Sequence, residues 1–242
     1  MRLDRLLVTV GLGSRTQVQR LIRSGAVAVD GQTLRDPGSQ IREDAAVAVS
    51  GQAVDTRQER HILLNKPAGV LTAARDSRQE TVMSLLPPAF TSLGCMPVGR
   101  LDKDTTGLLL LTTDGEMAHR LLSPARYVDK VYLAEVDGPL TAAHIEAFAA
   151  GLNLGDFVAA PAALDILESG EARALARVTV HEGRFHQVKR MFEAVGRTVL
   201  TLRRERFGPL TLPEDLTAGQ WRELTGEELA EVRRAVGMEA ER

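Results

Sequence analysis

The residues best suited to chemistry stand in one run between Gly99 and Gly115, which reads GRLDKDTTGLLLLTTDG. Its first half is a charged segment that contains Asp102 and Asp104. Its second half is apolar and ends in an Asp-Gly pair, which predicts a buried strand closed by a turn. A carboxylate on a loop beside a buried strand is held rigidly and stays accessible, as a catalytic acid group must be. Asp102 is therefore the first candidate for catalysis.

Three other interpretations of this run have less support. Asp102, Asp104 and Thr106 imitate the beginning of a calcium-binding loop. The twelfth position of such a loop requires a bidentate Glu, and here that position is Thr113. The D-x-D-x-T pattern also imitates aspartate-based phosphatases, in which the apolar strand precedes the nucleophile, whereas here it follows. An isolated Asp most often only stabilises a turn, but the length of the ordered run argues against that interpretation.

The composition indicates a globular protein. With 242 residues, of which 44% are apolar, one large domain or two unequal domains are expected. No segment reaches the roughly 18 apolar residues of a membrane helix, and the charged N-terminal segment does not resemble a signal peptide. Cys95 is the only cysteine, which excludes an intrachain disulfide and a thiolate metal cluster. We expect a reducing, cytoplasmic location.

Basic residues are concentrated in two segments, although the formal net charge is −2. Residues 1–29 contain five arginines and a single acidic residue, Asp4. Residues 184–206 contain seven lysines and arginines and two glutamates. Each segment alone could be an ordinary solvated face, but two of them on a weakly acidic protein favour local contact with a polyanion.

Residues 1–52 have the pattern of a small separate domain. Apolar residues at helical spacing predict a first helix that ends at Gly11. Ser14 and Gln17 form a capping box for a second helix. A strand, an Asp-Gly turn and a short return strand follow, and residues 45–49 predict one more strand.

Three arginines on the second predicted helix, Arg15, Arg20 and Arg23, project around its polar side. Arginines on an exposed helix can contact phosphates and so position a nucleic acid without reading its sequence. The polar residues 53–60 predict a linker, and residues 61–242 predict one α+β domain. Strands are predicted over 61–65, 108–112, 128–136, 175–181 and 198–202, and helices over 141–150, 186–195 and 225–236.

Several motifs together resemble the pseudouridine synthases, in the branch related to the small-subunit ribosomal RNA enzyme RsuA, and residues 1–52 resemble the S4 RNA-binding domain. The motifs are NKPAG at 65–69, GRLD at 99–102, KVY at 130–132, GRFHQVKRM at 183–191 and RERFG at 204–208. The resemblance implies an α+β fold, with a small N-terminal S4 (αL-type) domain. It also implies a catalytic domain with a central, largely antiparallel sheet.

The resemblance assigns catalytic roles to three residues. Asp102 matches the family's essential carboxylate, and Tyr132 matches a tyrosine that stacks on the target base. Lys189 matches the basic residue that partners the carboxylate. Helical geometry permits this last role, because Lys189 lies at the edge of the apolar stripe of residues 186–195, whereas Arg190 is expected on the far, solvated side.

Further residues are expected to contact the RNA. Arg100 could hold a flanking phosphate or help to extrude the base. Arg184 and His186 belong to the same motif as Lys189, and His186 is expected to position rather than to transfer a proton. Asn65–Gly69 is expected to be mainly structural.

We therefore predict an isomerase that converts a uridine to pseudouridine in small-subunit (16S) ribosomal RNA and needs no cofactor or metal. The expected partner is ribosomal RNA, a ribosomal subunit or an assembly intermediate, and the protein is expected to be monomeric and independent of membranes. The alternatives are a large-subunit enzyme of the same family, a non-catalytic RNA-binding or ribosome-assembly protein, and a metal-dependent phosphoesterase.

Overall fold

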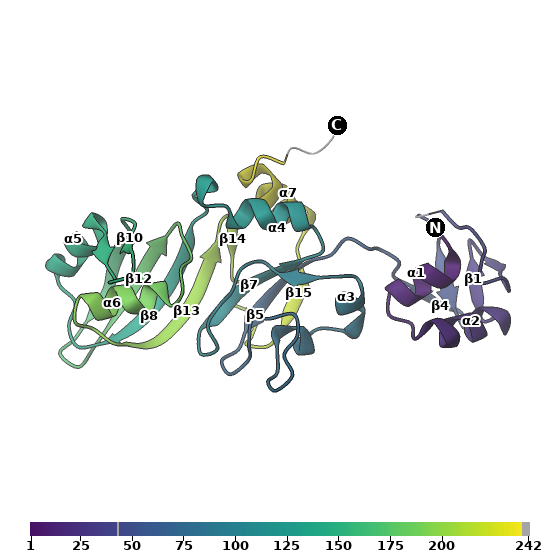
Figure 1. Cartoon of the computed structure of the whole chain (residues 1–242), viewed down its shortest axis with the longest axis horizontal. Coiled ribbons are helices and arrows are strands. Elements are labelled where there is room, and N and C mark those ends of the chain that lie inside the picture. The colour runs from purple at the N-terminus through teal and green to yellow at the C-terminus, as the bar shows by residue number, and fades with distance from the viewer. Residues whose placement is uncertain (43, 239–242) are drawn as a thin grey trace. The chain divides into compact units, whose positions relative to one another are not determined.

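The chain folds into two units in the computed structural model, which describes residues 1–42 and 44–238 (Figure 1). The first unit comprises Met1–Arg60 and Leu86–Met96, and the second comprises His61–Leu85 and Pro97–Arg242. Residues 239–242, which belong to the predicted 61–242 domain, lie outside the described residues. None of the helices in the described ranges has both the length and the apolar composition needed to cross a bilayer.

The first unit packs two helices against a small sheet with strand order β2-β1-β3-β4. Ser14 accepts a hydrogen bond from the amide of Gln17, whose side chain accepts one from the Ser14 amide, so the predicted capping box is confirmed. The buried apolar faces of both helices and of the sheet form one core. The elements are α1 (Leu3–Thr9), α2 (Arg15–Arg23), β1 (Val27–Val29), β2 (Gln32–Thr33), β3 (Val47–Val49) and β4 (Gln52–Val54).

Two features of this unit differ from the predictions. The start of the predicted linker is wrong, because Gln52–Val54 form β4, which pairs with β3 around a turn at Ser50 and Gly51. Both turn residues adopt positive φ, as a tight hairpin requires. The short helix α3 (Pro88–Ser92) was not predicted, and its segment clusters with the first unit.

The second unit is built on a nine-stranded sheet in which β11-β12-β8-β13-β7-β5-β15 are neighbours. All pairings are antiparallel along this order except β13 with β7. The predicted α+β fold with a largely antiparallel central sheet is confirmed. The strands are β5 (His61–Lys66), β7 (Thr106–Thr112), β8 (Lys130–Asp137), β11 (Ala163–Ser169), β12 (Arg173–Val180), β13 (Val199–Phe207) and β15 (Trp221–Glu223). The short strands β6 (Met96–Pro97) and β14 (Leu210–Thr211) pair with β7 and β13, and β9 (Leu152–Asn153) pairs with β10 (Val158–Ala159).

Helices cover the sheet in two groups (Figure 1). Helices α4 (Gly115–Leu122) and α7 (Gly226–Ala235) share a core with leucines of β5 and β7. Helices α5 (Ala142–Ala150) and α6 (Gln187–Ala194) meet through Phe148 and Phe192, whose ring centroids are 5.1 Å apart. Two single 3₁₀ turns, η1 (Val82–Leu85) and η2 (Pro124–Arg126), complete the unit.

The Asp-Gly pair after β7 begins a helix and does not form the predicted turn. The side chain of Asp114 accepts a hydrogen bond from the amide of Met117, so it caps α4. The same residue type that favours turns also favours helix N-caps, because its short carboxylate reaches nearby backbone amides. The apolar residues that follow at helical spacing, Met117 and Leu121, are the signal that distinguishes the two cases.

Gly107 permits the parallel contact between β7 and β13. Its φ is +101°, and a Cβ at this position would overlap the backbone of Arg204. A glycine is required where two backbones approach so closely. The loop that carries Asp102 enters β7 beside this contact, so the same sequence motif fixes both the strand junction and the loop.

Candidate active site

The loop that carries Asp102 is anchored by hydrogen bonds to its backbone. Thr72 Oγ1 donates to the carbonyl of Leu101 at 2.8 Å and accepts from the Leu101 amide at 3.2 Å. The Thr105 amide donates to the Asp102 carbonyl at 3.1 Å, which closes a turn around the carboxylate. Leu101 and Thr105 are buried, whereas the Asp102 side chain is 27% exposed. The carboxylate is therefore held from both sides and remains accessible.

Lys66 is the strongest of these anchors. Its side chain is fully buried, and its Nζ donates to the carbonyls of Pro67, Lys103 and Thr105 at 3.0, 3.2 and 3.0 Å. Three donors on one ammonium thus meet three acceptors, two of them in the Asp102 loop. Burial lowers the pKa of Lys66 to about 8, against the opposing influence of the nearby carboxylates. The ammonium ties the end of β5 to the loop that carries Asp102.

The turn before α6 presents His186 to the same site. His186 precedes the helix with a φ of +51°, an uncommon conformation for a non-glycine residue. Gln187, which is buried, accepts from the Arg184 amide at 3.0 Å and donates to Glu182 at 2.7 Å. A backbone bend of this kind persists only where its surroundings hold it, and here the Gln187 side chain does so.

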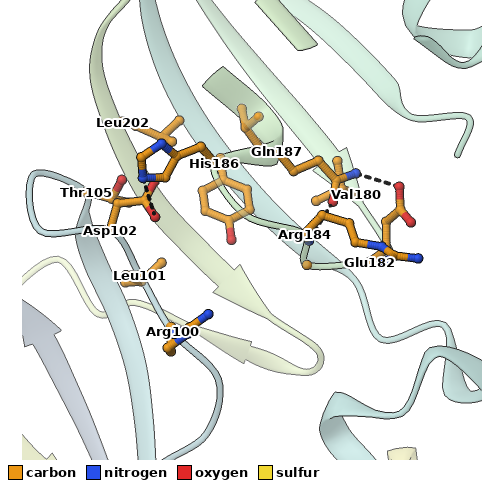
Figure 2. A pocket seen from close by; sticks show the side chains of 13 residues that line it. Arg100, Leu101, Asp102, Thr105, Val180, Glu182, Arg184, His186, Gln187 and Leu202 are labelled. Atoms are coloured by element: carbon orange, nitrogen blue, oxygen red, sulfur yellow. Dashed lines mark hydrogen bonds and ion pairs between the residues drawn. The ribbon is translucent and has the colours of Figure 1, made fainter. Parts of the chain in front are cut away.

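Asp102 faces two groups from this segment. His186 Nε2 lies 3.5 Å from one carboxylate oxygen, as Figure 2 shows, and Lys189 Nζ lies 3.8 Å from the other. Lys189 is closer to Asp104, at 2.6 and 2.7 Å. This hydrogen bond lowers the pKa of Asp104 below its ordinary value. Lys189 is thus shared between two carboxylates, and its shorter contacts are not to Asp102.

A pocket opens in front of Asp102 (Figure 2). Tyr132, on β8, contributes its buried ring to this pocket, and Arg100 and Arg184 contribute side chains at exposed positions. Its full lining is Arg100, Leu101, Asp102, Thr105, Tyr132, Val180, Glu182, Gly183, Arg184, His186, Gln187, Val188 and Leu202. A neighbouring hollow is lined by Lys189, Asp102, Asp104, His186 and the backbone around Gly69. Besides Tyr132, seven ionisable side chains of the described residues line these two spaces beside Asp102: Arg100, Lys103, Asp104, Glu182, Arg184, His186 and Lys189.

Arg190 differs from its predicted place on a solvated face. Its guanidinium donates to Asp156 and to the Leu154 carbonyl, and it lies 5.1 Å from the centre of the Phe157 ring. Arg184 lies over the same ring at 5.4 Å. Arg190 therefore ties α6 to the loop that joins β9 and β10. The side of α6 that was predicted to face solvent packs against this loop.

Two basic residues counted in the sequence motifs are interior. Arg204 is 2% exposed, and its Nε donates to the Leu108 carbonyl at 2.8 Å. Lys130 is also buried and donates to the carbonyls of Val128 and His181 at 3.0 and 3.2 Å. Burial, with a smaller contribution from Arg204, lowers the pKa of Lys130 to about 8. Because Arg204 is interior, the predicted basic segment 184–206 presents less charge to solvent than its composition indicates.

The arginines predicted to bind phosphates on α2 belong to the first unit. Arg15, Arg20 and Arg23 are exposed. The Nε of Arg15 is 4.0 Å from a carboxylate oxygen of Asp4, and the Arg15 side chain is 73% exposed. These guanidinium groups are open to an anionic ligand on the surface of their own unit.

Sequence reasoning gave the motif that contains Lys66 only a general structural role, and it gave Asp104 and Gln187 no role in the site. A lysine directly before Pro67, inside an apolar strand, was an available signal for Lys66, since a lysine is rarely buried without partners. Asp104 was considered only as part of two rejected patterns, the calcium-binding loop and the aspartate-based phosphatase motif. Its pairing with Lys189 joins residues 85 positions apart, and no local pattern predicts such a contact.

The arrangement suits chemistry at a sugar or base carbon. It offers a reachable carboxylate, an aromatic ring and several cations around one pocket. Within residues 1–42 and 44–238, no group of three or more His, Cys, Asp or Glu side chains is placed to hold a metal ion.

Comparisons with known proteins show the family to which the chain belongs. Residues 60–194 match the RNA pseudouridylate synthase family, and residues 1–47 match the S4 domain. The chain is 42% identical over 231 residues to YtzG of Bacillus subtilis, which is named as an uncharacterized RNA pseudouridine synthase. The alignment covers 95% of this chain and 97% of YtzG. It is 40% identical over 238 residues to ribosomal small subunit pseudouridine synthase A of Pseudomonas aeruginosa, covering 96% and 100%.

A solved structure extends the agreement to the fold. A crystal structure of a pseudouridylate synthase aligns with 96% of this chain and 99% of its own, with 32% identity and a TM-score of 0.65. The family model matches more than half of the chain, and the two relatives are 42% and 40% identical to it over nearly its whole length. The chain belongs to the RNA pseudouridylate synthase family, a family of isomerases, and carries an S4 domain at its N-terminal end.

Proposed function

We propose that this enzyme converts a uridine of small-subunit ribosomal RNA to pseudouridine, with Asp102 as the catalytic carboxylate. The observation that carries the proposal is the pocket in which Asp102 faces Tyr132, Arg100, Arg184 and His186. The relatives from Pseudomonas aeruginosa and Escherichia coli are named as small-subunit enzymes, at 40% and 39% identity over nearly the whole chain. They support the choice of small-subunit RNA over large-subunit RNA.

The reaction requires the N1–C1′ bond of the uridine to break and a C5–C1′ bond to form. C5 then loses its proton and N1 gains one, so the product is an isomer of the substrate. Asp102 acts at the ribose as a carboxylate, and the Lys189 ammonium and the His186 imidazole beside it would stabilise its negative charge. Tyr132 stacks on the base and limits its movement while it is detached from the sugar.

Asp102 lines a pocket, and a base that is stacked in an RNA helix cannot enter a pocket. The target nucleotide must therefore be flipped out of any helical stack to reach Asp102. Arg100 and Arg184 line this pocket and would hold the phosphates on either side of the extruded uridine. Residues 1–52 would act as the RNA-binding domain, with Arg15, Arg20 and Arg23 on further phosphates, and 61–242 as the catalytic domain. The matched ranges 1–47 and 60–194 support this division.

The proposal further places the enzyme in the cytoplasm, as a monomer that acts on ribosomal RNA, a subunit or an assembly intermediate without a small-molecule cofactor. The buried Cys95 fits this setting, because burial raises the pKa of its thiol to about 12 and leaves it unreactive.

Pseudouridine mapping in ribosomal RNA tests the function. Cells that lack the gene are compared with cells that express the unchanged protein, the Asp102→Asn variant or a control, Asp165→Asn, which alters an exposed carboxylate on β11. We expect one small-subunit pseudouridine to disappear on deletion and to return with the unchanged protein and the control only. Return of the modification with Asp102→Asn would exclude the assigned carboxylate, and loss of a large-subunit site instead would correct the substrate.

A further inference from the structure

An exposed aromatic residue, Phe185, stands in the chain between Arg184 and His186, which both line the pocket, and has no part in the roles assigned above. Phe185 is 69% exposed, although phenylalanine is among the residue types most often buried. Its ring stacks on the imidazole of His186, with centroids 3.8 Å apart and planes inclined by 18°. Since His186 covers one face, the exposed part of the ring includes the face that points away from His186.

The turn that carries Phe185 is fixed on both sides. Gln187 accepts from the Arg184 amide, and the amide of Arg190 donates to the His186 carbonyl at 3.0 Å. His186 itself is held at positive φ. Single exposed apolar side chains are common on protein surfaces. This one is presented by a strained and braced turn, which points to a purpose for its exposure.

The surroundings of Phe185 favour one kind of ligand. Arg184, the preceding residue, lines the pocket, as does Arg100, and His186 Nε2 lies 3.5 Å from Asp102 (Figure 2). A flat apolar face beside cations matches an unpaired nucleobase attached to a phosphate backbone, since bases stack on aromatic rings while the phosphates pair with basic groups. An apolar peptide would match the ring but not the cations around it.

We propose that Phe185 is a stacking platform for the base next to the uridine that enters the pocket. The base would extend the Phe185–His186 stack, which ends beside Asp102. When the uridine is extruded, the neighbouring base loses the uridine as its stacking partner. The Phe185 ring would then stack on that base in its place. The inference rests on the proposed function, because it requires an RNA strand at this pocket. It adds a residue that holds the strand open beside the extruded nucleotide.

Fluorescence of 2-aminopurine, which falls when the base stacks, tests this directly. The probes are two single-stranded cytidine dodecamers with 2-aminopurine either directly 5′ or directly 3′ of one central uridine, so that only one uridine is present to enter the pocket. The full chain carries Asp102→Asn, so that binding is measured without turnover. We expect quenching with one of the two probes and a Kd about tenfold weaker after Phe185→Ala, because loss of one stacked base on an aromatic side chain has an effect of this order.

Two further variants make the outcome specific. Phe185→Trp keeps an aromatic face and should preserve both quenching and affinity. Leu167→Ala alters a side chain that is 43% exposed on β11, and should change neither. Equal quenching by the Phe185→Ala variant, or no quenching with either probe, would overturn the proposal.

A kinetic measurement separates stacking from a structural role. On transcribed small-subunit RNA, Phe185→Ala in the otherwise unchanged enzyme should raise KM several-fold with little change in kcat, and Phe185→Trp should restore it. A fall in kcat without a rise in KM would assign Phe185 to the architecture of the site. The fluorescence assay does not depend on turnover, so a failure of the proposed reaction and a failure of stacking give different results.

Discussion

Basic side chains serve opposite purposes in the two units of this molecule. On α2, Arg15, Arg20 and Arg23 are exposed and free to meet an anion from solvent. In the catalytic unit, Lys66 and Lys130 are buried, and their ammonium groups donate to backbone carbonyls. The first set would supply salt-dependent attraction to phosphates, whereas the second holds loops and strands in place. A count of basic residues therefore does not measure how much charge faces RNA.

Apart from replacement of Asp102 itself, the largest effect is expected where an interior lysine supports the loop that carries Asp102. Lys66→Met removes three hydrogen bonds, two of them to the loop of Asp102, and leaves their carbonyl oxygens without this donor. We expect the single-turnover rate to fall about 100-fold, because small displacements of a catalytic group have effects of this size. The rate is measured by tritium release from RNA labelled at C5 of uridine.

Lys103→Met is the matched control for this substitution. Lys103 lies in the same loop and borders the hollow beside Asp102, but its Nζ contacts the exposed side chain of Gln79 at 2.7 Å rather than the loop backbone that Lys66 holds. We expect less than a threefold change for the control. A well-folded Lys66→Met variant with a near-normal rate would contradict the anchoring role.

A smaller effect is expected from the shared cation of the site. Lys189→Met removes the positive charge beside Asp102 and Asp104 and should lower the single-turnover rate about 10- to 100-fold. Lys189→Arg should recover most of the activity, because it restores the charge. Asp104→Asn should have a weaker effect than Lys189→Met, since Lys189 would keep its contact with Asp102. A larger loss for Asp104→Asn would show that pairing with Asp104 is the principal function of Lys189.

The pKa of Lys66 predicts an alkaline limit to activity. Because burial lowers that pKa to about 8, the group loses its proton as the pH rises through this value. A neutral amine has two N–H donors, so one of the three carbonyls loses its hydrogen bond. We expect the single-turnover rate to decline above about pH 8, and the residual activity of Lys66→Met to show no such decline.

Loss of stability does not account for this decline. The folded-state pKa of Lys66 lies below its ordinary value of 10.5, so between the two values the unfolded chain binds the additional proton. The contribution of Lys66 to the free energy of unfolding therefore increases across this pH window. Lys130, with a pKa of about 8, contributes in the same direction. Urea unfolding at pH 7 and pH 9.5, compared between the enzyme and Lys66→Met, measures the difference.

Removal of divalent metal is expected to have no effect on the rate. The isomerisation needs neither a Lewis acid nor an activated water, and the roles assigned to the pocket require only protein side chains. Tritium release is measured with excess EDTA on an RNA whose structure does not depend on magnesium. A rate that returns only when a divalent ion is added would favour the phosphoesterase interpretation.

Elements with strong local signals could be predicted from the sequence. The capping boxes at Ser14 and Thr225 and the alternating pattern of β12 gave correct helices and strands. β11 was missed because its polar residues and largely exposed side chains resemble a loop, and pairing with β12 stabilises it as a strand. Asp114 was misassigned because one side chain can serve a turn or a helix cap.

The candidate site could also be predicted only where local motifs identify its residues. The motifs brought Asp102, Tyr132 and His186 together as residues of one pocket, and the structure places them there. The burial of Lys66 and Arg204 depends on carbonyls from distant strands and loops, and the pairing of Lys189 with Asp104 depends on the docking of α6. Such long-range partners exist only after the fold has formed, so no local pattern predicts them.

The division of roles between the α2 arginines, which would bind RNA, and Asp102, which would carry out the reaction, can be tested in one experiment. It compares the unchanged enzyme, a variant with Arg15, Arg20 and Arg23 changed to Ala, and Asp102→Asn, by RNA affinity across salt concentrations and by single-turnover tritium release at saturating RNA. The triple variant should bind more weakly, with a salt slope shallower by about one for each lost contact, and react at nearly the normal rate. Asp102→Asn should bind normally and release no tritium. A triple variant that binds normally but reacts slowly, or turnover by Asp102→Asn, would contradict the account.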